Sequence, residues 1–159
     1  NFLSSSPVWG LTFYLQAYSR PVNYYETDRM SIVHHSNYIR WMEEARLDYM
    51  HKAGVDYPSM EADGIIMPVT GVKCSYKTSL RYGDTFTVKT TLTGFNGVRM
   101  EFSYKIYTDD PDNPCCVGES GHCFLDAVTR QPVSLRRHGL KYYEIGVNLL
   151  AAEQSTGKE

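Results

Sequence analysis

One stretch of the sequence, residues 36–53, constrains the fold more than any other. It reads SNYIRWMEEARLDYMHKA, contains no Gly or Pro, and repeats its apolar side chains at helical spacing. Ser36 is placed to cap the start of a helix and Gly54 to end it. The pattern predicts one long, substantially buried helix. Its apolar face comprises Tyr38, Trp41, Met42, Ala45, Tyr49 and Met50, widened by Ile39 and Leu47.

Strands are predicted on both sides of this helix. Residues 11–25 are rich in β-favouring side chains, and we expect an extended arm leading into a first strand, VNYYE, at residues 22–26. A helix followed by strands in succession predicts an α+β domain with a mainly antiparallel sheet wrapped around the helix. The later β-rich runs are residues 67–79, 85–94, 98–108 and 117–127, separated by turn signals at 82–84, 96–97 and 109–114. Residues 126–132 are typical of a hairpin end, and residues 140–150 fit either a closing strand or a short helix.

Size and charge narrow the class of protein. A chain of 159 residues with 42% hydrophobic residues fits one domain, and a net charge of -2 does not favour binding to nucleic acid or to a membrane. No apolar run approaches the roughly 18 residues of a membrane span, and the opening residues do not resemble a secretory signal. We therefore expect a soluble, cytoplasmic protein. Its expected parts are an N-terminal extension at 1–18, in part a processing remnant, a domain at 19–150 and a flexible C-terminal tail at 151–159.

The cysteines do not indicate a disulfide framework or a metal site. Two of the four are adjacent, and no CxxC or HxxxH spacing is present to chelate a metal ion. We expect free thiols in a reducing compartment, with no metal and no organic cofactor. The cysteines are Cys74, Cys115, Cys116 and Cys123.

Asp28 stands between the expected first strand and the long helix. A carboxylate can attack a carbonyl carbon or activate water, and the free backbone N–H groups of a helix start can hold an oxyanion. Such an oxyanion site would lie near His35. An Asp after a strand is, however, commonly a turn or capping residue, so the spacing alone does not establish chemistry.

The segment TDRMSIVHHSNYIRWMEEAR resembles the signature of the 4-hydroxybenzoyl-CoA thioesterase family of hot-dog proteins. Two later segments, GIIMPVTGVKCSYKTSLRYGD and GESGHCFLDAVTRQPV, are similar to that family's second strand and last hairpin. The resemblance covers about residues 21–136. It implies a hot-dog fold, in which a curved antiparallel sheet wraps one long central helix. It also implies a second protomer, with acyl-CoA bound at the interface.

The resemblance also implies roles for individual residues. Asp28 matches the family's catalytic carboxylate, as base or nucleophile, and the backbone N–H of His35 matches its oxyanion donor. Asn37 and Tyr38 match a pair that would shape the acyl pocket. Two positions depart from the family: Ser31 replaces a common Gly, and His34 replaces a common Tyr and is either an acid-base group or a packed ring.

The implied reaction is hydrolysis of an acyl or aroyl thioester to the free acid and CoA. The acyl group would contact aromatic and apolar side chains near Tyr38, Trp41, Ile66 and Met67. The CoA phosphates would meet Lys77, Arg81 and Arg99. The expected assembly is a homo-oligomer, either a dimer or a homotetramer formed as a dimer of dimers.

Three alternatives remain at this stage. A hot-dog protein could bind acyl-CoA or another lipid-like ligand without turnover. A helical carboxylate, Glu43 or Glu44, could replace Asp28 as the catalytic acid. The third alternative is a hydratase or dehydratase of acyl thioesters that uses a His-Asp pairing.

Overall fold

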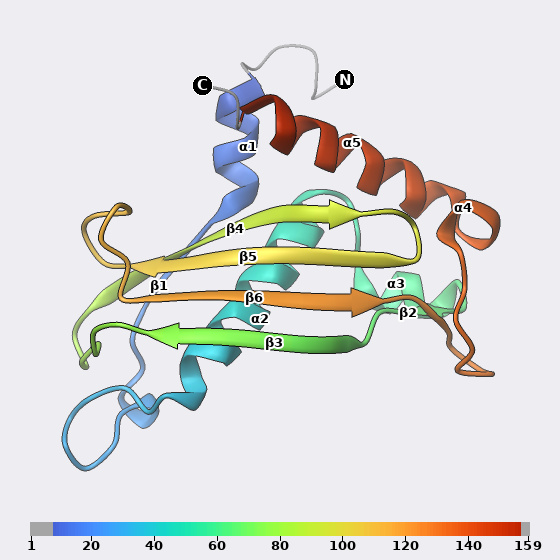
Figure 1. The fold of residues 1–159 in the computed structure, drawn as a ribbon. Helices are drawn as coiled ribbons and strands as arrows, with labels where there is room; N and C mark the ends of the chain where they lie inside the picture. Colours follow the sequence, from blue (N-terminus) through green and yellow to red (C-terminus); the bar gives the residue numbers. More distant parts are fainter. Residues whose placement is uncertain (1–7, 157–159) are drawn as a thin grey trace.

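The computed structural model describes residues 8–156 and centres on a five-stranded antiparallel sheet in the order β1-β4-β5-β6-β3 (Figure 1). Along β4, β5 and β6 buried and more exposed residues alternate, as expected for strands with one face on a core. The expected antiparallel sheet is confirmed. Its strands are β1 (Ala17–Pro21), β3 (Val69–Tyr76), β4 (Thr85–Phe95), β5 (Arg99–Tyr107) and β6 (Cys116–Cys123).

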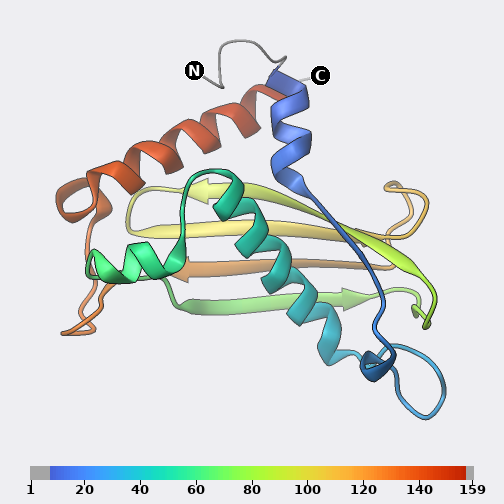
Figure 2. The ribbon, with the colours of Figure 1, turned by 180° about the vertical axis from the view of Figure 1, so that it is seen from behind.

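Helix α2 (Ser36–Lys52) crosses one face of this sheet (Figure 2). Trp41 and Tyr49 are fully buried, and every residue of the predicted apolar stripe is buried. Gly54 follows the helix with φ 95°, a conformation that favours Gly, so the predicted helix end is confirmed. Ile39 and Leu47 were wrongly assigned to the buried face, because they are 38% and 42% exposed.

The N-terminal prediction is wrong in its secondary structure. Residues 8–16 form helix α1 (Val8–Gln16), and the strand that follows is β1, not residues 22–26. Gln16 of α1 donates a hydrogen bond to Glu153 of the last helix at 2.8 Å. Tertiary packing therefore overrides the β-favouring composition of this segment. Residues 1–7 lie outside the described part of the chain.

Residues 22–26 contain a short 3-10 helix, η1 (Tyr24–Glu26), where a strand was expected. The Glu26 N–H donates to the Asn23 carbonyl at 3.0 Å, and the Asn23 N–H donates to Glu26 Oε1 at 2.8 Å. Such local bonds offer the backbone an alternative to a strand ladder. The chain therefore turns immediately before Asp28.

The C-terminal segment forms a helix, α5 (Leu140–Thr156), which decides between the two predictions for residues 140–150. It packs beside α1 at one edge of the sheet, over β4 (Figures 1 and 2). Residues 151–156, expected in a flexible tail, continue this helix, and Glu153 accepts a hydrogen bond from Tyr49 of α2 at 2.9 Å. The remaining elements are α3 (Tyr57–Ala62), α4 (Leu135–His138) and a two-stranded sheet of β2 (Ile65–Ile66) and β7 (Leu125–Asp126). The expected hairpin end at residues 126–132 is confirmed, since Leu125 and Pro132 form an antiparallel bridge and the Asp126 N–H donates to the Gln131 carbonyl at 2.8 Å.

Candidate active site

A short loop joins η1 to α2 and carries Asp28. An antiparallel bridge between Thr27 and Val33 closes it, and the Asp28 N–H donates to the Ile32 carbonyl at 2.8 Å. Ser31 lies at the loop's tip with φ 65°, in the left-handed region that Gly tolerates best. The loop thus keeps at Ser31 a backbone conformation suited to the Gly that the resemblance led us to expect.

The Asp28 carboxylate has one anchored oxygen and one open oxygen. Oδ1 accepts the Met30 N–H at 2.8 Å and makes a longer contact, 3.4 Å, with the Ile32 N–H. Oδ2 accepts no hydrogen bond from any residue in the described part of the chain. The side chain is exposed. One oxygen therefore orients the carboxylate while the other is available to a ligand or to water.

The start of α2 contains an amide without a partner. His35, not Ser36, occupies the N-cap position, with helical backbone angles and no side-chain cap bond. Within residues 8–156 the His35 N–H donates to no acceptor, whereas the next amides are satisfied. A free N–H at a helix start attracts a negatively charged oxygen, because the helix dipole is positive there.

His34 caps the helix with its imidazole ring. Its Nδ1 accepts the Ser36 backbone N–H at 3.2 Å and lies 2.8 Å from Ser36 Oγ. The ring also stacks on His35, with 4.3 Å between ring centroids. Since Nδ1 accepts a hydrogen bond from a main-chain donor, the geometry favours the tautomer protonated at Nε2. Of the two roles considered for His34, these contacts support a packed, capping ring.

Asp28 and His35 line one cleft of ≈ 230 Å³. Its floor is formed by Tyr38 from α2 and by the end of β3. Four predicted site residues therefore meet here: Asp28, His35 and Tyr38 from one segment, and Lys77 from a part of the chain distant in sequence. The full lining is Asp28, Ile32, Val33, His34, His35, Tyr38, Tyr76, Lys77, Thr78 and Ser79.

Tyr76 is a cleft residue that the sequence analysis missed. Its ring meets those of Tyr38 and His35 edge to face, at centroid distances of 5.4 and 6.0 Å. Burial and the neighbouring Cys74 thiol raise the pKa of Tyr76 to about 12, so its hydroxyl stays protonated at neutral pH. Alternation along β3 puts Tyr76 on the same face of the strand as Cys74, but only the position of the strand end beside the loop places Tyr76 in the cleft.

Asn37 and Tyr38 are both buried but make different contacts. The Asn37 side chain is buried and donates to the Glu26 carbonyl at 3.0 Å, so it fixes the loop and does not line the cleft. The Tyr38 hydroxyl accepts the Leu80 N–H at 3.1 Å, which holds its ring at the cleft floor. Of the pair, only Tyr38 is placed to touch a ligand.

The other predicted binding residues do not line the cleft. Arg81 is adjacent to it, since its backbone bridges Ile32. Arg99 begins β5 opposite Cys123, at the far end of the sheet, and Met67 precedes β3 at that same end. The 8 residues of β3 place these ends about 23 Å apart. Within one chain, Arg99, Met67 and Ile66 therefore do not join the Asp28 cleft.

Trp41, expected near the acyl group, is a core residue. It is fully buried and stacks on Phe86, with 3.9 Å between ring centroids. The two helical carboxylates also lie outside the cleft lining. Glu44 pairs with Arg20 at 2.9 Å, and Glu43 lies 3.9 Å from Arg46.

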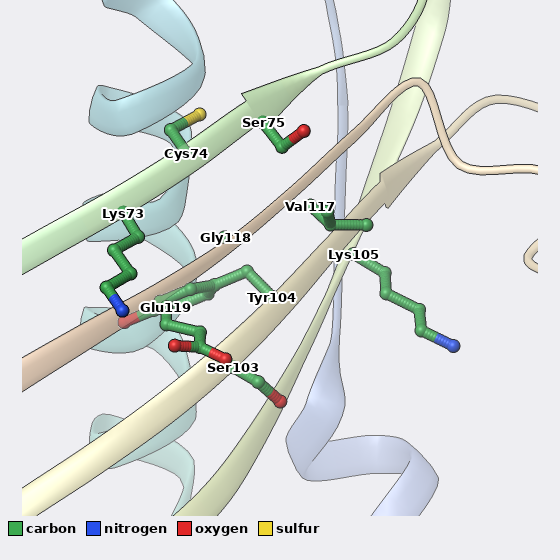
Figure 3. Close-up of a pocket in the computed structure, with 9 residues that line it drawn as sticks. All are labelled: Lys73, Cys74, Ser75, Ser103, Tyr104, Lys105, Val117, Gly118 and Glu119. Carbon is green, nitrogen blue, oxygen red and sulfur yellow. The ribbon is translucent and has the colours of Figure 1, made fainter.

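A larger hollow, ≈ 450 Å³, lies on the sheet over β3, β5 and β6 (Figure 3). It contains neither Asp28 nor a helix start, and its rim is formed by exposed side chains such as Lys73 and Glu119. Figure 3 places α2 behind the sheet from this hollow. Its chemistry is that of a solvated sheet face, so the smaller cleft is the candidate active site.

The residues that the structure describes contain neither a candidate metal site nor a candidate membrane-spanning helix. Among those that the structure describes, no three His, Cys, Asp or Glu side chains converge in a way that could hold a metal ion. The described helices also include none with the length and apolar character of a membrane span.

Comparison with known proteins places the chain in a family. The family model described as the thioesterase-like superfamily matches residues 22–141, which include the whole cleft. The chain belongs to the thioesterase-like superfamily. The Bacillus subtilis (strain 168) protein YneP, named as an acyl-CoA thioesterase, is 36% identical over 117 residues, covering 73% of this chain and 83% of YneP.

A solved structure of DHNA-CoA thioesterase from Staphylococcus aureus superposes with a TM-score of 0.82 and 31% identity, covering 91% of this chain and 95% of that one. The 1,4-dihydroxy-2-naphthoyl-CoA hydrolase of Thermosynechococcus vestitus is 26% identical over 122 residues, or 76% of this chain and 83% of the relative. These matches confirm the predicted family, the hot-dog fold and the enzyme class, a thioester hydrolase.

Proposed function

We propose that this thioesterase hydrolyses acyl-CoA, with Asp28 as the catalytic carboxylate and the His35 N–H as oxyanion donor. One observation carries the proposal: Asp28 Oδ2 and the His35 N–H are both without partners in the described chain and belong to residues lining the same cleft. Unpaired polar groups are costly unless a ligand or water uses them. A thioester carbonyl needs both a nucleophile or base and an oxyanion donor.

In the proposed reaction the thioester oxygen accepts the His35 N–H, and the positive end of α2 stabilises the charge that develops on it. Asp28 then either attacks the carbonyl carbon, giving a mixed anhydride that water cleaves, or removes a proton from an attacking water. The C–S bond breaks in both routes, and the CoA thiolate takes up a proton. No metal or organic cofactor enters either route.

The cleft favours a flat or medium-length acyl group. Tyr38, Tyr76 and His35 present ring faces and edges to it, a surface suited to aromatic and alkyl groups. Lys77 lines the cleft and Arg81 borders it, so both are proposed as contacts for CoA phosphates. Relatives named for naphthoyl-CoA support testing aroyl thioesters beside acyl ones.

We also propose a homodimer formed through β3, with a dimer of dimers as the larger assembly. β3 is an edge strand whose residues are mostly exposed, and Val69, Val72 and Tyr76 are each more than 40% exposed. Edge strands of this kind are normally paired or covered. The cleft adjoins the end of β3, so a partner would border the site. Light scattering that finds an active monomer at micromolar concentration would contradict this assembly.

The test of the reaction is a thiol-release assay across acyl-CoA and aroyl-CoA substrates with wild type and Asp28→Asn. We expect Asp28→Asn to keep the fold and substrate affinity and to lower kcat at least about a hundredfold. Glu43→Gln and Glu44→Gln serve as matched controls and should retain near-wild-type kcat. Near-wild-type turnover by Asp28→Asn would overturn the site, a larger loss at either Glu would favour a helical carboxylate, and binding without thiol release by wild type would favour a binding protein.

A further inference from the structure

Glu26, two residues before Asp28, has an unusual number of contacts for one side chain. It is 4% exposed, and its carboxylate accepts four hydrogen bonds. Oε1 accepts Arg20 Nη1 at 2.9 Å and the Asn23 N–H at 2.8 Å. Oε2 accepts Arg20 Nη2 at 2.8 Å and Trp41 Nε1 at 2.6 Å. The carboxylate therefore ties β1 to the middle of α2.

Burial alone would raise the pKa of Glu26, but hydrogen bonds from Arg20 and Trp41 outweigh it and lower the pKa. The carboxylate therefore stays ionised at neutral pH. A buried, ionised group with every acceptor site engaged is held in one geometry.

The main chain of Glu26 holds the other side of the catalytic loop. Its carbonyl accepts the His34 N–H at 2.9 Å and the Asn37 side-chain amide at 3.0 Å. His34 immediately precedes His35, and Asn37 belongs to the first turn of α2. One residue thus fixes both the segment that leads into Asp28 and the segment that presents the His35 N–H.

We propose that Glu26 is a positioning residue for thioester hydrolysis, which sets the separation between the Asp28 carboxylate and the His35 amide. This inference rests on the proposed function. Reaction geometry is demanding, and a displacement of about 1 Å can cost about a hundredfold in rate. Glu26 touches neither group directly and acts through the loop that it holds.

The chain offers a matched pair of variants, because Arg20 has two carboxylate partners. Glu44 accepts Arg20 Nε at 2.9 Å and Nη2 at 3.0 Å, and among the described residues its one other hydrogen bond is from the Tyr18 hydroxyl. Glu44 is thus bonded to Arg20 and not to the loop. Glu26→Gln puts an amide N–H₂ group, itself a donor, where four donors converge. Glu44→Gln also replaces a carboxylate by a neutral amide, but it leaves the hydrogen bonds of the loop in place.

The experiment measures thiol-release kinetics and the hydrogen exchange of the His34 amide by NMR in both variants. In Glu26→Gln we expect kcat to fall at least about tenfold with KM within about twofold, and the His34 amide to exchange at least about tenfold faster. In Glu44→Gln kcat and exchange should match wild type. If circular dichroism shows that Glu26→Gln does not fold, Trp41→Phe takes its place, because it removes one of the four donors to Glu26. Trp41→Phe should lower kcat and speed His34 exchange, each by less than expected for Glu26→Gln.

Unchanged exchange and unchanged kcat in Glu26→Gln would overturn the proposal, and so would equal losses in Glu44→Gln. The hydrogen-exchange measurement does not depend on substrate turnover. If wild type released no thiol from any substrate, the proposed function would fail, while faster His34 exchange confined to Glu26→Gln would still support the positioning of the loop.

Discussion

The two ends of helix α2 differ in packing: its start is open to solvent, and its C-terminal end is buried. At its start, Asp28 and His35 are exposed and each retains an unpaired polar group above a cleft. At its other end, α3 and α5 close over Met50, and aromatic side chains such as Phe95 and Phe124 fill the space, leaving ≈ 10 Å³ empty. Apolar burial stabilises the packed end, so the helix is secured there, whereas the exposed polar groups at the open end are accessible to a ligand or to water.

The largest expected effect lies at the packed end. Phe124 is 1% exposed and meets Phe95 edge to face, with 6.2 Å between ring centroids. Phe124→Ala should lower the free energy of unfolding by about 3–5 kcal/mol, because a large cavity replaces the ring. Urea unfolding measures this loss. The kcat of the folded variant should stay within about twofold of wild type. A hundredfold lower kcat would show that the packed end also controls catalysis, against the contrast between the two ends.

Histidines provide the next contrast, since His122 is 1% exposed while His34 and His35 are exposed. Burial, with a smaller contribution from Arg46, lowers the pKa of His122 to about 4. In the unfolded chain it would titrate near 6.5. The native state therefore stays neutral where the unfolded state binds a proton, so stability is full above pH 6.5, falls as the pH drops from 6.5 to 4, and levels off below that.

The size of this effect is about 3 kcal/mol between pH 7 and pH 4. His122→Leu should remove that part of the pH dependence, while Ser120 keeps its bond with Tyr104 at 2.6 Å. Urea unfolding of both proteins at pH 7, 5.5 and 4.5 measures it. Parallel stability curves for the two proteins would mean that His122 is not held neutral in the fold.

The packed centre of the fold was largely predictable from the sequence. The apolar spacing from Tyr38 to Met50 placed α2 and its buried face, and turn residues separated four of the strands. Asp28 and His35 were proposed as site residues because one segment, which spans the loop and the helix start, resembles the family signature, and their roles stay predictions. The helix and the strands are local features, and local spacing predicts them.

Features that depend on contacts distant in sequence were missed or left open: α1 was not predicted, and residues 140–150 were left between a strand and a helix. Helices α1 and α5 are secured by the Gln16–Glu153–Tyr49 bonds, which join residues up to 137 positions apart. The cap by the His34 ring and the four donors around Glu26 likewise depend on side chains brought together by folding. Tyr76 entered the cleft because β3 ends beside the loop, which no local pattern encodes.

The central claim is that the open end of α2 works through the main-chain N–H of His35. The most direct measurement compares kcat in His35→Ala and His35→Pro, with folding checked by circular dichroism. His35→Ala keeps the amide and should lose about tenfold or less, whereas His35→Pro deletes the N–H at a position where Pro is tolerated and should lose at least about a further hundredfold. A folded His35→Pro variant as active as His35→Ala would remove this amide from the oxyanion site.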